Sequence, residues 1–225
     1  MRVSALEGHR IWAASYDAGD NPVLALERRS MESLLGFIMP SNVIDVGCGS
    51  GRWLVHFQKG GAHVFGIDLC EEMLVRAKKH RTLCGRLALG DAEYLPIRSD
   101  SADLVLCSMA LGYFRNINEV LHEFARVAAP GGYIAISDLH PASIAAGWTR
   151  SFKARGALYE IDHIAHSVAE IDNAAHCAGL RNLFRQSAYF GQPELAIFQH
   201  KSKAKLFPEI CETPALYLHT WKKPC

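Results

Sequence analysis

The sequence predicts an α/β fold, in which a doubly wound and mostly parallel sheet carries helices on both faces. After Pro40, apolar strand segments alternate with segments of helical character. Strands that are separated by helices pair in parallel through right-handed crossovers. The length of 225 residues suits one well-packed α/β domain better than two, so residues 1–225 are expected to form a single domain.

The predicted elements of residues 41–140 form the core of this domain. The strands are expected at 43–46, 63–67, 86–89, 103–108 and 133–137, and the helices at 52–60, 71–80 and 118–128. A Pro130-Gly131-Gly132 turn separates the last helix from the last strand.

The N-terminal 40 residues read as a helical cap on the edge of this core. Asn21 can cap a helix and Pro22 fits its first turn, and apolar residues then recur at helical spacing as far as Ile38. A helix is therefore expected over residues 21–38.

The last third, residues 141–225, reads as late strands with two insertions. Residues 141–156 have no clean period, and a strand is expected near 158–164. A helix at 167–178 ends at Gly179, a natural C-cap. The strands at 180–190 and 215–221 have no predicted helix between them, only an irregular excursion over 191–213, so they are expected to pair antiparallel at one edge.

The composition of the chain limits the classes of molecule that it is expected to bind. The formal net charge is +1 and 21% of residues are charged, so no strong field would attract nucleic acid or an anionic membrane, and a small-molecule partner is favoured. Seven cysteines without a C-x-x-C pair indicate reduced thiols. Because neither a signal peptide nor an apolar run of about 20 residues is visible, a cytoplasmic location is expected.

The segment from Val43 to Gly51 is the most informative of the chain. A buried strand ends in Asp45, and the glycines of a tight turn follow in the pattern G-x-G-x-G. An acid at this place suits a ligand that carries an ammonium group and is awkward beside a diphosphate. Arg52 also stands outside the G-x-G-x-x-G pattern of nicotinamide enzymes, so an oxidoreductase is disfavoured.

This D-x-G-x-G-x-G run resembles the first motif of the class I methyltransferases that use S-adenosylmethionine, in particular those of the small-molecule, type 11 kind. Asp68 after the second strand, Gly90-Asp91-Ala92 after the third and Pro130-Gly131-Gly132 before the fifth extend the resemblance over residues 43–138. The resemblance implies a seven-stranded sheet with an antiparallel edge strand, S-adenosylmethionine as cofactor, and a substrate lid formed by the late insertions.

Several residues become candidates for binding the cofactor. A carboxylate at Asp68 can accept both ribose hydroxyls, although it can also simply cap the next helix. The resemblance places Asp91 at the adenine amino group and the Ala92 N–H at a ring nitrogen. Tyr16 is a candidate contact to the methionine carboxylate or, alternatively, an aromatic staple. The full predicted set is Tyr16, Asp45, Gly47, Cys48, Gly49, Asp68, Leu69, Asp91, Ala92 and Ser108.

The predicted chemistry is an in-line displacement of the sulfonium methyl group, accelerated mainly by positioning. His140, at the exit of the fifth strand, is the candidate general base, and a rigid His-Pro turn is the alternative. His163, His166 and His176 lack a metalloenzyme spacing, so no metal site is predicted.

Three alternatives stay open at this point. The acceptor can be a protein or an RNA, although the near-neutral charge disfavours nucleic acid, and the place of the D/N-P-P-Y motif of base-modifying enzymes reads Ser108-Met109-Ala110-Leu111. The chain can also be a non-catalytic S-adenosylmethionine-binding module, since no catalytic residue is obligatory. The sequence leaves the acceptor atom and the oligomeric state undetermined.

Overall fold

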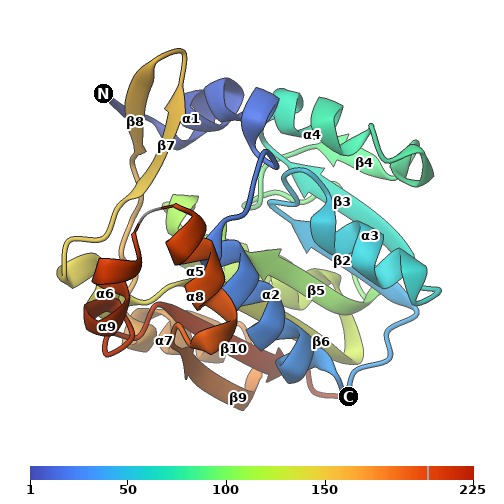
Figure 1. The fold of residues 1–225 in the computed structure, drawn as a ribbon. Coiled ribbons are helices and arrows are strands. Elements are labelled where there is room, and N and C mark those ends of the chain that lie inside the picture. Colours follow the sequence, from blue (N-terminus) through green and yellow to red (C-terminus); the bar gives the residue numbers. More distant parts are fainter. Residues whose placement is uncertain (202) are drawn as a thin grey trace.

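A seven-stranded sheet forms the centre of the computed structural model, which describes residues 1–201 and 203–225 (Figure 1). Its strand order is β4-β3-β2-β5-β6-β10-β9. Neighbours from β4 to β6 pair in parallel, and β10 is antiparallel to both β6 and β9, which confirms the predicted fold class. The strands are β2 (Asn42–Val46), β3 (His63–Asp68), β4 (Leu87–Leu89), β5 (Ala102–Ser108), β6 (Ala128–Leu139), β9 (Arg181–Ala188) and β10 (Leu216–Lys222).

Several helices begin at residues whose side chains cap them. Asn21 accepts hydrogen bonds from the N–H groups of Val23 and Leu24 at the start of α2, and Ser167 forms a capping box with Glu170 at the start of α7. No helix of the described residues is both long and apolar enough to cross a membrane. The helices are α1 (Ala5–Trp12), α2 (Pro22–Leu35), α3 (Arg52–Lys59), α4 (Glu71–Ala77), α5 (Ile117–Val127), α6 (Pro141–Ala145), α7 (Val168–Cys177), α8 (Gln192–His200) and α9 (Phe207–Ile210).

Two apolar cores lie on opposite faces of the sheet. Along β5, Leu104 and Leu106 point to the face covered by α2, α3 and α8, whereas Val105 and Cys107 point to the face covered by α5 and α7. Side chains alternate in this way because a strand has a period of two. The central strands are therefore apolar on both sides, as a parallel sheet requires.

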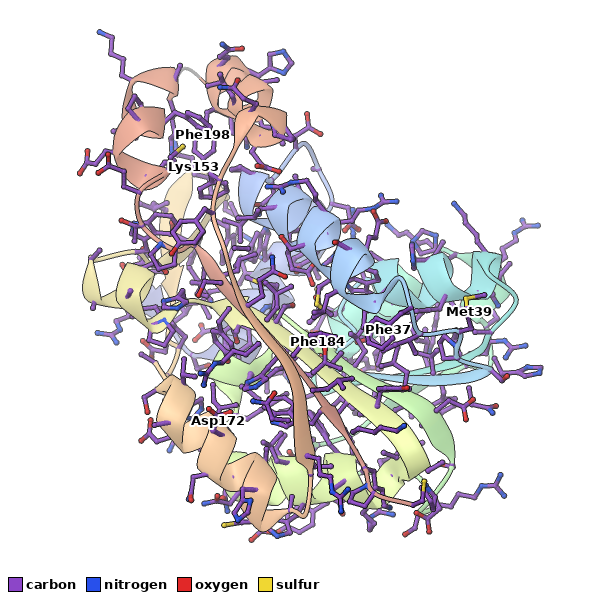
Figure 2. The ribbon with its side chains drawn as sticks, turned by 90° about the horizontal axis from the view of Figure 1, so that it is seen from below. Phe37, Met39, Lys153, Asp172, Phe184 and Phe198 are labelled. Carbon is purple, nitrogen blue, oxygen red and sulfur yellow. The ribbon has the colours of Figure 1, made fainter. Side chains whose placement is uncertain are left out.

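The same alternation continues on the edge strand β9 (Figure 2). Phe184 packs against Phe37 just after α2, with ring centroids 5.4 Å apart. The next residue, Arg185, points to the other face and forms an ion pair with Asp172 of α7 at 2.7 Å. Edge strand β9 is thus held from both sides by the helices that flank it.

A small second sheet was not predicted. It consists of β1 (Arg2–Val3), β8 (Ala157–Ile161) and β7 (Arg150–Ala154), and Figure 1 shows its hairpin beside α1 and the N-terminus. Residues 1–40 contain α1 and α2, as expected for a helical cap, and the two-residue β1 in addition. The strand expected near 158–164 is β8, whereas β7 lies in the segment 141–156, where no strand was expected. Local sequence patterns do not reveal this sheet, because β1 has only two residues and its partner strand lies more than 150 positions away in the sequence. Arg2, for example, pairs with Glu160.

Two further predictions need correction. Residues 191–213 are not helix-free, since they contain α8 and α9; Pro193 lies in the first turn of α8, where proline is tolerated. The Pro130-Gly131-Gly132 segment is an irregularity inside β6 rather than a turn before it. Ala128 pairs with Ala102 and Tyr133 with Leu104, so the residues between them bulge from the ladder.

Candidate functional site

The carboxyl ends of β2, β3, β4 and β5 surround a cavity of about 310 Å³ that α1 covers. A smaller pocket adjoins it and shares Tyr16, Gly47, Gly49 and Ser108 with it. Together the two hollows are lined by all the residues predicted to bind the cofactor, namely Tyr16, Asp45, Gly47, Cys48, Gly49, Asp68, Leu69, Asp91, Ala92 and Ser108.

The glycine turn is packed so closely that side chains would not fit. Gly47 has φ +71°, and a Cβ there would lie 2.6 Å from the Cβ of Ala110. Gly51 has φ +81°, and its Cβ would lie 2.7 Å from Leu83. Both the left-handed backbone and the close neighbours therefore require glycine. The N–H of Gly47 also donates to the carbonyl of Ile67 at 2.8 Å, which fixes the turn against β3.

Asp68 combines the two roles that the sequence left open. Its Oδ1 accepts from the N–H of Cys70, the cap of α4, at 2.8 Å, and its Oδ2 accepts from the N–H of Gly49 at 2.7 Å. Burial raises the pKa of this carboxyl, while the backbone hydrogen bonds act in the opposite direction. Because each carboxylate oxygen accepts two hydrogen bonds, Asp68 caps the helix and still has an acceptor position on each oxygen.

Asp45 is the unusual charge of the site. Its side chain is 2% exposed, and Oδ1 has no hydrogen-bond partner in the described part of the chain. Burial raises its pKa to about 8; the nearby Arg52 opposes this rise, and the charges of Asp68 and Glu27 add to it. A buried, unpaired carboxylate is costly. A cationic group placed in the adjoining pocket would supply the missing partner.

A polar brace lies beneath the glycine turn and was not predicted. Glu27 of α2 is fully buried and accepts hydrogen bonds from the hydroxyls of Ser108 and Ser137 at 2.6 and 2.8 Å. Trp53 Nε1 donates to the same carboxylate at 3.2 Å, and Arg52 forms an ion pair with it. This brace joins α2 and α3 to the ends of β5 and β6.

The sequence did contain a signal for this brace. Glu27 lies three residues after Leu24 and four before Met31, on the apolar stripe by which the helix was predicted. A charged residue on such a stripe is buried only when it is paired. The brace also occupies the hydroxyl of Ser108, so this residue lines the cavity with its side chain already engaged.

The N-terminal segment is tied over the site by Arg76 of α4. This guanidinium donates to the carbonyls of Ala13 and Ala14 at 3.0 Å and pairs with Asp17. Tyr16, which the tie holds over both hollows, has a pKa raised to about 12 by burial. Its ring also meets Trp12 edge to face at 4.8 Å, so Tyr16 both packs as an aromatic and faces the cavity.

The remaining predicted cofactor residues differ in what they offer. Asp91 is exposed, and its Oδ1 accepts from the N–H of Glu93 at 3.0 Å in a local turn, beside the buried Ala92. Leu69 is 54% exposed at the cavity wall. Cys48 points its sulfur at β3, where a Cβ on Gly66 would lie 2.8 Å away, so only its backbone is free to face the pocket.

His140 does not line either hollow. Its Nδ1 accepts from the N–H of Ala142 at 3.1 Å and caps α6, as the rigid-turn alternative required. β6 ends beyond β5, to one side of the cavity, which explains the distance from the glycine turn. The histidine that lines the cavity is His9 of α1, which no sequence motif indicated. Tyr113, Phe114 and Arg115 after β5 were also missed.

The late histidines bind backbone instead of gathering into a site. His163 contacts the carbonyl of Ile161 at 3.3 Å, and His166 contacts that of Phe114 at 2.9 Å. Within residues 1–201 and 203–225, no three His, Cys, Asp or Glu side chains are placed to hold a metal ion.

Comparison with known proteins finds methyltransferases that are similar to part of this chain. Residues 44–136 match the model of a methyltransferase domain. Among curated proteins, the malonyl-[acyl-carrier protein] O-methyltransferase of Hamiltonella defensa is 37% identical over 111 residues, or 49% of this chain and 43% of that protein. The enzyme of the same name from Hahella chejuensis is 30% identical over 189 residues, covering 79% of this chain and 63% of its own. The chain spans about half the length of the first such relatives.

Solved structures share the fold. An S-adenosylmethionine-dependent methyltransferase from Mesorhizobium loti superposes with a TM-score of 0.69 at 23% identity, over 90% of this chain and 100% of its own. A methyltransferase from Haloferax volcanii, solved in complex with the activator Trm112, superposes with a TM-score of 0.72 at 22% identity, over 99% and 98% of the two chains.

Proposed function

Because residues 44–136 match the model of a methyltransferase domain, we propose that this protein transfers the methyl group of S-adenosylmethionine to a small-molecule acceptor. S-adenosylmethionine supplies an activated methyl group on a sulfonium centre. The chain's own residues bind and orient this cofactor, exclude water and hold the acceptor in line with the methyl group.

The observation that carries the proposal is the unpaired Asp45 beside the glycine turn. The ammonium group of the methionine end is the cation that satisfies this carboxylate. Arg52 and Tyr16 line the same pocket and fit the carboxylate of the methionine end, one as a cation and one as a hydroxyl donor.

The adenosine end of the cofactor is assigned to the carboxylates at the ends of β3 and β4, whose oxygens can accept further hydrogen bonds. Asp68 lies at the end of β3, where its two oxygens fit the adjacent ribose hydroxyls. Asp91 and Ala92, after β4, fit the amino group and a ring nitrogen of adenine. In this assignment α1 and the residues after β5, which line the rest of the cavity, would hold the acceptor.

The small formal charge of +1 supports a small acceptor over a nucleic acid. A carboxylate carried on an acyl-carrier protein is a second candidate, favoured by the names of the similar curated proteins. Two alternatives remain: the acceptor is a protein side chain, or the protein only binds the cofactor. Turnover distinguishes an enzyme from a binding protein, and the identity of the methylated product distinguishes the acceptors.

The test has two steps. A thermal-shift comparison of S-adenosylmethionine, S-adenosylhomocysteine and NAD is expected to show stabilisation by the two adenosyl ligands alone. Incubation with methyl-labelled cofactor and a panel of hydroxyl, amine and carboxylate metabolites is then expected to yield S-adenosylhomocysteine and a labelled product. Stabilisation by NAD alone would contradict the cofactor assignment, and binding without turnover on any acceptor would leave a binding module.

A further inference from the structure

His9 occupies a place that the cofactor assignment leaves unused. It lies on α1 and lines the cavity opposite the glycine turn. Its ring stands edge to face on Tyr113, with centroids 4.8 Å apart, and 6.5 Å from Tyr16. Tyr113, just after β5, packs closely against the imidazole and restricts how it can turn.

One hydrogen bond fixes the tautomer of His9. Its Nδ1 lies 2.8 Å from the carbonyl oxygen of Ala5, one turn earlier in the same helix. A carbonyl oxygen only accepts, so Nδ1 must carry the hydrogen. In the neutral ring the lone pair is then on Nε2, on the edge that points away from the helix. His9 therefore presents a proton acceptor to the cavity.

The surroundings keep this ring neutral. Burial lowers the pKa of His9 below its ordinary value of 6.5, and the positive charge of Arg150 acts in the same direction. The Ala5 carbonyl and the carboxylate of Asp68 act in the opposite direction. Tyr16, whose ring centroid lies 6.5 Å from that of His9, has a pKa raised to about 12 by burial.

We propose that His9 is the general base of the methyl transfer and that the acceptor is a weakly acidic hydroxyl group. This proposal rests on the proposed function. Nε2 of His9 takes the hydroxyl proton as the acceptor oxygen bonds to the methyl carbon, and the electron pair of the breaking carbon–sulfur bond goes to sulfur, which leaves neutral S-adenosylhomocysteine. A carboxylate acceptor has no proton to lose, so His9 distinguishes the two acceptor classes.

The substitution His9→Gln keeps a polar group in the cavity that cannot take up a proton. With methyl-labelled cofactor and a panel of phenols, the variant is expected to lose activity by about 100-fold at pH 7, as is typical of a missing general base. Its rate should recover as the pH rises towards the pKa of the phenol, and its Kd for S-adenosylhomocysteine should stay unchanged. His163→Gln is the matched control, since His163 is also bonded to a carbonyl but lies outside the cavity.

A second measurement needs no acceptor. Nitrogen NMR of the ring in the S-adenosylhomocysteine complex is expected to show hydrogen on Nδ1 and a bare Nε2 at pH 7. The opposite tautomer would overturn the proposal. Unchanged activity of His9→Gln on phenols would also overturn it, and so would methylation of carboxylates alone. A weaker Kd for S-adenosylhomocysteine with unchanged turnover would overturn it too, because His9 would then be a cofactor contact. Binding of the adenosyl ligand without turnover on any acceptor would refute the enzyme proposal and the base together.

Discussion

The carboxyl edge of the main sheet and the small sheet β1-β8-β7 are held together in different ways. At the main edge, backbone turns and buried carboxylates fix one another, as Asp68 fixes the turn at Gly49. In the small sheet, aromatic rings stack in a row, with Trp12, Phe152 and Tyr159 at successive centroid distances of 4.8 and 5.3 Å. The first arrangement is specific for a ligand, whereas the second depends on apolar contact that many sequences can supply.

Arg150 is the main polar link between the two regions. From β7 it pairs with the buried Asp138 of β6 and donates to the carbonyl of Met109 at 2.7 Å. Its guanidinium also lies 4.6 Å from the ring centroid of Tyr113 at the cavity wall. α1 packs on β7 and β8 and also covers the cavity, so we expect that cofactor binding and the stability of the small sheet can be perturbed separately.

Cutting the link is expected to have the largest effect on stability. Arg150→Gln leaves the Asp138 carboxylate without its cation, which costs about 3 kcal/mol for a broken buried pair. Hydrogen exchange should show lost protection in β7 and β8, and calorimetry should show that S-adenosylhomocysteine still binds. Equal loss of protection across β2 and β3 would mean that the two regions are one unit.

Removing the strand-end carboxylate is expected to act on the other region. Asp68→Ala should raise the Kd for S-adenosylhomocysteine by about 100-fold, or about 2.7 kcal/mol, because two charge-assisted hydrogen bonds to ribose are lost. Asp91→Ala is the control at the next strand end, where the acid is exposed, and about a tenfold effect is expected there. Normal binding by Asp68→Ala would show that this residue only caps α4.

The polar brace beneath the glycine turn predicts a smaller loss of stability. Glu27→Gln removes the charge that Arg52 and three neutral donors share, at a cost of about 2 kcal/mol in the free energy of unfolding. Glu32→Gln, on the same helix but in an exposed pair with Arg28, should change it by less than about 0.5 kcal/mol. Denaturant titration of the two variants checks this, and equal effects would contradict a structural role for the brace.

The smallest expected effect is on the pH dependence of stability, and it comes from a residue outside both regions. His219 in β10 is fully buried, and burial lowers its pKa to about 4, against the attraction of Asp172. Since the unfolded chain binds this proton more readily, the stabilisation is present above the ordinary pKa of 6.5 and is lost as the pH falls from there towards 4. Wild type should lose roughly 1–2 kcal/mol more between pH 7 and 5 than His219→Gln. Parallel Tm curves for the two proteins would contradict this.

Sequence patterns predicted the carboxyl edge of the main sheet but not the small sheet β1-β8-β7. The strands β2, β3, β4 and β5 could be predicted because each is a short apolar run with a residue that lines the site at or just after its end, as in Asp45 and Asp68. The small sheet could not, because β1 gains its partner only through contacts between distant residues. The sequence pointed to His140 and gave no sign of His9 for the same reason: a strand exit is visible in sequence, whereas the packing of α1 over the cavity is not.

Asp45 provides the most direct test of the cofactor site. With its pKa raised to about 8, this carboxyl is mostly protonated at pH 7, and pairing with the ligand ammonium requires its ionised form. Calorimetry of S-adenosylhomocysteine binding in phosphate and in Tris should therefore show release of about one proton per ligand at pH 7. Asp45→Asn should bind more weakly and release none. Equal proton release by wild type and Asp45→Asn, or tight binding by the variant, would contradict the assignment of the ammonium to Asp45.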